Sequence, residues 1–179
     1  TPNANYNGDD SFSFSVSDGE FSSSATVSLT IDAVNDAPVL ASVSDVSFDE
    51  DGSGSTSLSA SDVDGDDLSY SITGGSDIIA TLDGTDVFFS APTNYNGSET
   101  FTVSVTDGEL EDSQSITVTV NAVNDAPVAT TGLSGTTLED QSIVITLSGS
   151  DVDGDALIFS LDTDAINGSV VINGSVATY

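Results

Sequence analysis

The residues of this chain best suited to chemistry are aspartates that alternate with other residues in two short runs. The first run is Asp62-Val63-Asp64-Gly65-Asp66-Asp67, and the second is Asp151-Val152-Asp153-Gly154-Asp155. This spacing places successive carboxylates around one turn, and carboxylate oxygens are hard ligands of the kind that Ca²⁺ requires. Because calcium takes about six to eight oxygens, one run cannot complete a site alone. We therefore expect each run to share its ion with acids from elsewhere in the chain.

A calcium loop flanked by helices is the rival interpretation of these runs, and it fits badly. Such a loop needs Gly at its sixth position and Glu at its twelfth. Those positions hold Asp67 and Thr73 in the first run, and Ala156 and Asp162 in the second. The flanking segments also have the alternation of strands rather than the period of helices.

The charge of the chain excludes most other chemistry. The chain has 30 Asp and Glu residues and no Lys, Arg, His or Cys, which gives a formal net charge of -30. An imidazole base, a Schiff-base amine and a thiolate are therefore all absent, as is any cationic clamp for phosphate or nucleic acid. Paired carboxylates could hydrolyse glycosides, but these acids lie in turns and linkers. We expect no enzyme, no nucleic-acid partner and, without an apolar run of about 18 residues, no membrane insertion.

Five motifs recur along the chain at a single offset. Each pair is separated by 89 positions, as from Asn5 to Asn94, so chance similarity is negligible. Repetition at a fixed period is the signature of a tandem array. The recurring motifs begin at Asn5 and Asn94, Ser17 and Thr106, Val34 and Val123, Glu50 and Glu139, and Ser61 and Ser150.

The repeats predict three segments. Residues 1–37 are the C-terminal part of one module, residues 38–126 a complete module, and residues 127–179 the N-terminal part of a third. Residue 179 leads naturally into residue 1, since the joined sequence completes another module of about 90 residues. We interpret the chain as a window on a longer array. If its ends were real chain termini, both partial modules would lack strands and would be unstable alone.

Period-two alternation of apolar and polar residues predicts strands throughout. Turn residues such as Asp-Gly, Asn-Gly and Gly-Gly separate the strands. About seven short strands in about 90 residues indicate an all-β immunoglobulin-like sandwich, with modules arranged end to end. The alternating apolar positions include Phe12, Phe14 and Val16; Ala25, Val27, Leu29 and Ile31; Leu58 and Ala60; Leu68, Tyr70 and Ile72; Phe101, Val103 and Val105; Ile116, Val118 and Val120; Ile143, Ile145 and Leu147; and Leu157, Phe159 and Leu161.

The order of the acidic motifs resembles cadherin repeats, and most of all the cadherin-like tandem repeats of giant bacterial surface adhesins. The resemblance rests on Val34-Asn35-Asp36-Ala37-Pro38 together with the first aspartate run, and it covers nearly the whole chain. It implies calcium at each module junction. The implied ligands are Asp32, Asn35, Asp36, Asp62, Asp64 and Asp107 at the first junction, and Glu50, Asn124, Asp125, Asp151 and Asp153 at the next, with Asp18 as the counterpart of Asp107.

Two departures from the cadherin pattern concern the number of ions. The acidic motif in the middle of a cadherin module has only Asp9, Asp10 or Glu99 nearby, and Asn121 replaces Asp32 in the second linker. Other interpretations stay open as well. Turn and cap chemistry also favours Asp and Asn, and it could account for Asp18 and Asp107 alone. Acids outside the motifs are expected to be solvated surface: Asp45, Asp77, Asp83, Asp86, Asp112 and Asp162.

The sequence favours a structural, calcium-stiffened repeat of an extracellular bacterial adhesin stalk or surface filament. Its expected partners are neighbouring modules of the same chain, with like filaments or cell-surface glycans as further candidates. One alternative is an adhesive module that binds a glycan or a cell directly. Another is a passive spacer in a secreted enzyme. A binding module should show an exposed aromatic or regular Thr pattern confined to one module, and a catalytic domain would show itself in flanking sequence.

Overall fold

The computed structural model describes residues 1–179 and contains strands and turns but no helix. This confirms the all-β prediction, and no helix forms that could cross a membrane. The chain divides into two compact units, Thr1–Asn121 and Ala122–Tyr179. The predicted module boundaries at residues 37 and 126 stay a prediction.

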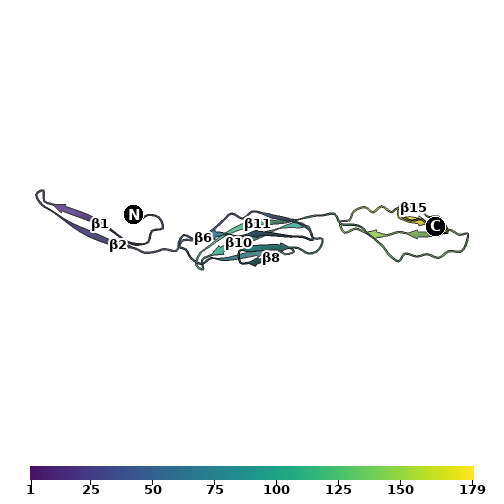
Figure 1. Cartoon of the computed structure of the whole chain (residues 1–179), viewed down its shortest axis with the longest axis horizontal. Coiled ribbons are helices and arrows are strands. Elements are labelled where there is room, and N and C mark those ends of the chain that lie inside the picture. The colour runs from purple at the N-terminus through teal and green to yellow at the C-terminus, as the bar shows by residue number, and fades with distance from the viewer. The chain divides into compact units, whose positions relative to one another are not determined.

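The first strands form a hairpin, which we call the N-terminal hairpin (Figure 1). It consists of β1 (Gly8–Ser17) and β2 (Ser22–Ile31), paired antiparallel with Phe12 opposite Val27. These two strands form a sheet by themselves. Their apolar residues alternate with Ser and Thr, as the sequence predicts, but no third strand pairs with either edge.

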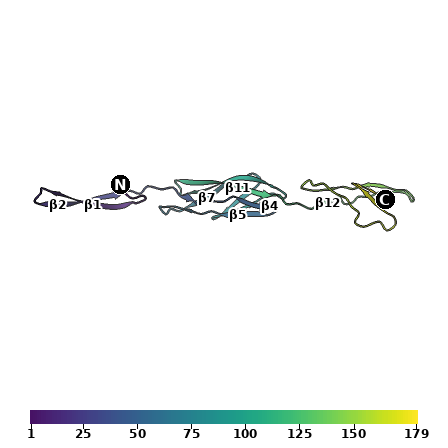
Figure 2. The ribbon, with the colours of Figure 1, turned by 90° about the horizontal axis from the view of Figure 1, so that it is seen from above.

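The central module is a sandwich of two sheets, built from the strands β3 to β11 (Figure 2). One sheet has the order β4-β11-β10-β7 and the other β5-β9-β8, while β3 pairs with β6. All pairs are antiparallel except β11 with β4. The bounds are β3 Val39–Leu40, β4 Val46–Asp49, β5 Ser53–Ser57, β6 Ala60–Ser61, β7 Ser69–Gly74, β8 Ile79–Asp83, β9 Asp86–Ser90, β10 Gly97–Thr106 and β11 Glu111–Asn121.

The core lies between the two sheets and is built from the alternating residues. On β10 and β11, Phe101, Val103 and Val118 are almost completely buried. Phe89 of β9 meets Phe101 edge to face, with ring centroids 5.4 Å apart and an interplanar angle of 68°. Edge-to-face aromatic pairs add to the stabilisation that burial alone gives. The same alternation therefore determines both the strands and the core that holds the two sheets together.

A single carboxylate holds the loop between β7 and β8. Glu99 of β10 accepts hydrogen bonds from the backbone N–H groups of Ser76, Asp77 and Ile78 at 2.9, 3.1 and 3.0 Å, and from the Ser76 hydroxyl at 2.6 Å. The Ser76 hydroxyl contributes most to lowering the pKa of Glu99, from 4.5 to about 2, because these bonds favour the charged form. Gly75 begins the turn at φ +73°, where a Cβ would come within 2.5 Å of the Ile78 carbonyl oxygen.

We expect Glu99→Gln to destabilise the central module by about 1 kcal/mol at neutral pH, because the amide replaces a charged acceptor. The folded pKa lies below the unfolded one, so the carboxylate's contribution is complete above about pH 5. It is lost as the pH falls from 4.5 toward 2. The difference in free energy of unfolding between the variant and the wild type should therefore shrink as the pH falls below about 5. Denaturant titration at several pH values measures it. Glu111→Gln, an exposed glutamate on β11, should show no such convergence.

The C-terminal unit repeats part of the strand arrangement of the central module. Its bounds are β12 Val128–Ala129, β13 Val144–Thr146, β14 Gly149–Ser150, β15 Val171–Asn173 and β16 Val176–Thr178. Strands β12 and β14 pair, and the other three form a sheet of order β13-β16-β15. Asp51 and Asp140 both adopt a left-handed φ, at 59° and 64°, so the backbone repeats at the predicted offset.

One strand prediction is wrong in this unit. The alternating residues Leu157, Phe159 and Leu161 predict a strand, but the structure forms none there. Their counterparts in the central module are Leu68, directly before β7, and Tyr70 and Ile72 of β7, which pairs with β10. Within residues 122–179 no strand pairs with this segment, so it has the alternating pattern without a hydrogen-bonded neighbour.

Candidate calcium site

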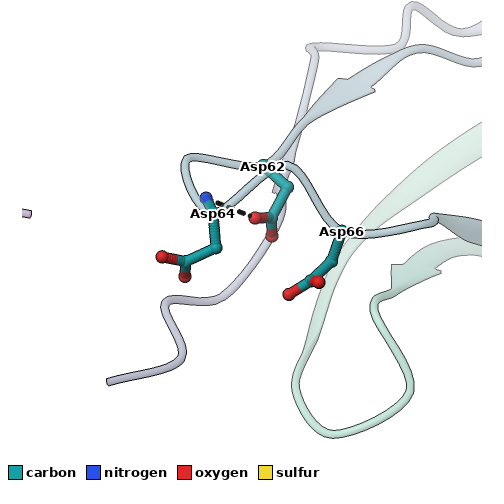
Figure 3. Close-up of side chains that lie close together, drawn as sticks. All are labelled: Asp62, Asp64 and Asp66. Carbon is teal, nitrogen blue, oxygen red and sulfur yellow. Dashed lines mark hydrogen bonds between the residues drawn. The ribbon is translucent and has the colours of Figure 1, made fainter. Parts of the chain in front are cut away.

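The first aspartate run forms a loop that gathers three carboxylates, and we call residues 62–67 the acidic loop. One carboxylate oxygen from each of Asp62, Asp64 and Asp66 lies within 4.8 Å of the others. Figure 3 shows the three groups on the same side of the loop. The Oδ1 atom of Asp62 accepts hydrogen bonds from the N–H groups of Asp64 at 2.8 Å and Gly65 at 3.2 Å. Gly65 takes a φ of +82°, which glycine adopts without strain.

The second oxygen of Asp62 shows that the loop fits a cation. The Oδ2 atom of Asp62 has less than 1 Å² of exposed surface and accepts no hydrogen bond. A buried carboxylate oxygen without a donor is costly, and the chain contains no Lys, Arg or His to neutralise it. A hard divalent cation would satisfy this oxygen, and the oxygen-only donor set is the one calcium prefers.

The linker before the central module reaches the same loop. The N–H group of Asp36 donates to Oδ2 of Asp64 at 2.8 Å. The side-chain amide of Asn35 donates to Oδ2 of Asp107 at 2.9 Å. A hollow of about 570 Å³ is lined by Asn35, Asp64, Asp66 and Asp107, among others. The structure thus brings together the linker, the acidic loop and the β10–β11 turn, as the sequence predicts for one junction.

Asp18 and Asp107 accept backbone hydrogen bonds in the turns that follow β1 and β10. Oδ1 of Asp107 accepts hydrogen bonds from the N–H groups of Glu109 and Leu110, both at 2.7 Å. Leu110, then Glu109, then the Asn35 amide lower the pKa of Asp107, because each favours the charged form. The N–H groups of Phe21 and Glu20 likewise lower the pKa of Asp18. Turn chemistry therefore accounts for one oxygen of Asp107, and its other oxygen faces the linker.

The second acidic run repeats the local geometry within the C-terminal unit. The N–H group of Asp125 donates to Oδ2 of Asp153 at 2.7 Å, as Asp36 does to Asp64. Oδ1 of Asp151 accepts from the N–H group of Asp153 at 3.0 Å. Asn124 instead bonds the Asp125 carbonyl through its amide at 3.0 Å. Three predicted residues of this set therefore cluster, and the loop recurs with its linker contact.

Asp18 lies in the turn after β1, apart from the first set. Asp32 lies beside that set, since it lines a hollow of about 350 Å³ together with Asp36 and Asp64. Glu50 is buried, and its N–H group donates to the Asn121 carbonyl at 2.9 Å. Asp66 belongs to the carboxylate cluster, and the signal for it was its place as the third aspartate of the run. The grouping of Glu50 with the second set stays a prediction.

The fold and the site together define a tandem β-sandwich protein with acid-lined loops beside its linkers. The family comparison agrees: a bacterial Ig domain model matches residues 35–121 and again residues 124–179. The chain therefore belongs to the bacterial Ig domain family. A cadherin-like domain model matches residues 1–32. These matches confirm the predicted kinship, and domains of these families are typical of extracellular surface and stalk proteins.

Several solved structures are similar to the chain. An endo-fucoidan hydrolase of glycoside hydrolase family 107 matches with 26% identity and a TM-score of 0.38, over 68% of this chain and 20% of its own. The surface layer protein SbsC, domains 1–6, matches with 15% identity and a TM-score of 0.44, over 97% of this chain and 25% of its own. The titin domains Z1Z2 in complex with telethonin match with 12% identity and a TM-score of 0.36, over 81% of each chain. The chain thus spans a fifth to a quarter of the first two proteins, and no curated protein matches it.

Proposed function

We propose that this chain is a stretch of an extracellular bacterial stalk or adhesin filament whose module junctions are stiffened by calcium. The observation that carries the proposal is the buried Oδ2 atom of Asp62, which has no hydrogen-bond donor and lies in a cluster of three carboxylates. The linker residues Asn35 and Asp36 bond to Asp107 and Asp64, so a cation held by the loop would act on the linker as well.

Electrostatics gives the direction of the effect. Two full charges within 4.8 Å repel by about 3 kcal/mol or more at the effective dielectric constant of a protein surface. A bound divalent cation would remove this repulsion and hold oxygens of the loop and the linker together. Without the cation, the repelling carboxylates would favour a linker with many conformations. Affinities of extracellular calcium modules, about 10⁻⁴–10⁻³ M, suffice where calcium is millimolar.

The side-chain composition of the chain also favours a structural role over catalysis. The chain has no His, Lys, Arg or Cys to serve as a base, a nucleophile or a phosphate clamp. Its neighbouring modules are the proposed partners, and its repeated loops suit a spacer better than a ligand site confined to one module.

The test is a distance distribution measured across the first linker. Since the chain has no Cys, the double variant Ser24→Cys/Thr81→Cys places one spin label on β2 and one on β8, both at exposed positions. Pulsed electron resonance should give a broad distance distribution in chelator. It should give one at least about twofold narrower in millimolar calcium, because the ion would remove the repulsion that spreads the linker.

Two controls make this test decisive. Sodium chloride of the same ionic strength should leave the distribution broad, because screening alone does not bridge oxygens. The same labels in an Asp62→Asn background should lose most of the calcium response. A distribution that is equally narrow in chelator and in calcium would rule out calcium stiffening.

A further inference from the structure

The chain changes sheets as it enters the central module, and this change leaves backbone groups outside the ladders. Strand β3 pairs antiparallel with β6, whereas β4 pairs parallel with β11. Residues 41–45, between β3 and β4, belong to no strand. Buried backbone N–H and C=O groups are rarely left unpaired. The partners that this crossing segment finds therefore show how the entry of the chain is held.

Side chains of β11 supply the missing partners. The carboxylate of Asp112 accepts a hydrogen bond from the Leu40 N–H group at 2.8 Å. The side-chain amide of Gln114 accepts one from the Val43 N–H group at 3.1 Å and donates one to the Val43 carbonyl. A neighbouring strand would offer the same donor and acceptor. Gln114 thus takes the place of a ladder rung where the two backbones do not pair.

The contact continues in the same register along β4. Oδ1 of Asp45 accepts a hydrogen bond from the Thr117 N–H group at 2.7 Å. The backbone ladder between β4 and β11 follows, and after it the Glu50 N–H group donates to the Asn121 carbonyl at 2.9 Å. All of these partners lie 71 or 72 positions apart along the chain. The contact gives hydrogen bonds to Asp45 and Asp112, which the sequence predicted only as solvated surface.

We call the contact of residues 40–50 with residues 112–121 the parallel seam. Because its two segments run in the same direction, the chain enters the module beside Asp112 and leaves it beside Glu50. Tension along the chain therefore pulls the two segments in opposite directions along their own axes. All the hydrogen bonds of the seam are then loaded together, whereas strands that are peeled apart from one end lose their bonds one at a time.

The side chains at the entry end of the seam are particular to the central module. Asp112 and Gln114 are in phase with the buried Ile116, on the side of β11 where alternation predicts apolar residues. At the equivalent positions of β2 the chain has Ser23 and Ala25, and alanine has no side-chain donor or acceptor. The repeat pattern therefore does not account for the two polar residues, but the crossing segment that they hold does.

We propose that the central module bears tension along the chain and that the parallel seam is its force-bearing contact. Asp112 and Gln114 fasten the entry of the chain, where no backbone ladder with β11 forms. A tether under load gains from such a contact, because forced unfolding is governed by the unfolding rate. This function goes beyond calcium stiffening of the linkers, since it lies within one module and needs no ion.

The test is to unfold the module by force from two directions, in full-length chains. Since the chain has no Cys, introduced cysteines can carry the DNA handles of an optical trap. Ala37→Cys with Ala122→Cys loads the seam in shear, because these handles lie beyond its opposite ends. Ser53→Cys with Ala122→Cys places both handles near Glu50, so the seam is peeled from one end. All three positions are exposed, and chelator in every sample removes any effect of calcium.

The expected results combine the direction of the force with a change in the seam. The wild-type unfolding force should be at least about twofold higher in shear than in peeling, because a shared load slows unfolding. Asp112→Ala/Gln114→Ala should remove most of this difference. It should leave the peeling force nearly unchanged, because the lost bonds lie at the far end from the handles. A gain in length of about 3.5 Å for each residue between the handles identifies unfolding of the module.

A control that also removes hydrogen bonds separates force-bearing from general stability. Glu99→Ala removes four bonds to the loop between β7 and β8, and the seam variant removes three. Denaturant titration should show a loss of stability in both variants, but Glu99→Ala should keep the shear force of the wild type. Two results would each overturn the proposal: equal wild-type forces in the two directions, or a shear force lowered as much by Glu99→Ala as by the seam variant.

Discussion

Replacing Phe89 by Ala is expected to lower the free energy of unfolding of the central module by about 3–5 kcal/mol. Its ring is 1% exposed and packs edge to face on Phe101 across the two sheets. Truncation removes buried apolar surface and leaves a cavity that rigid strands cannot close. Since single domains are stable by only about 5–15 kcal/mol, this variant should be partly unfolded near 40 °C. Denaturant titration followed by circular dichroism measures the loss.

The matched control is the neighbouring residue on the same strand. Phe88 is 50% exposed and faces away from the core. Phe88→Ala should therefore change the free energy of unfolding by less than about 1 kcal/mol, as is usual for surface substitutions. Because the two variants remove the same atoms from adjacent positions, equal losses would contradict the two-sheet arrangement of the core.

The comparison between Phe89 and Phe88 also explains why the sequence predicts this fold well. Alternation determines which side of a strand is buried, so Phe101, Val103 and Val105 could be placed in the core from sequence alone. The repeat supplied the module length, and the turn glycines supplied the breaks. What alternation cannot supply is pairing: Leu157, Phe159 and Leu161 have the same pattern as β7 but form no strand. A strand requires a partner, and no local pattern says whether that partner is present.

The candidate calcium site, like the fold, could be predicted from the sequence only in part. The run of three aspartates predicted a cluster of oxygens, and the loop brings Asp62, Asp64 and Asp66 together. For Asp107 the sequence left turn chemistry and calcium binding as alternatives, whereas the structure shows one oxygen bonded to its own turn and the other receiving the Asn35 amide. The sequence did not reveal the Glu99 network, because the donors are backbone N–H groups of a loop more than twenty positions away. Both features depend on side-chain direction, which requires coordinates.

Asp62→Asn is expected to weaken calcium binding at least about tenfold, which corresponds to about 1.4 kcal/mol. The substitution removes an anionic oxygen that is buried without a donor, and this oxygen is the strongest single indication of a cation site. The asparagine side chain keeps one carbonyl oxygen, so it can still accept from the N–H groups of Asp64 and Gly65 and preserve the turn. Isothermal titration calorimetry at about 0.15 M NaCl, where the Debye length is about 8 Å, measures the affinity with distant charges screened.

The control for this variant removes one charge at a distance from the loop. Asp83 is exposed at the end of β8, and Asp83→Asn should change the affinity less than about twofold, because a screened charge contributes little. Stability without calcium provides a second contrast. Asp62→Asn relieves repulsion among three carboxylates, so the free energy of unfolding in chelator should stay equal or rise, while the stabilisation that calcium adds should fall. Equal losses of affinity in both variants would mean that calcium responds to the net charge of -30 and not to the acidic loop.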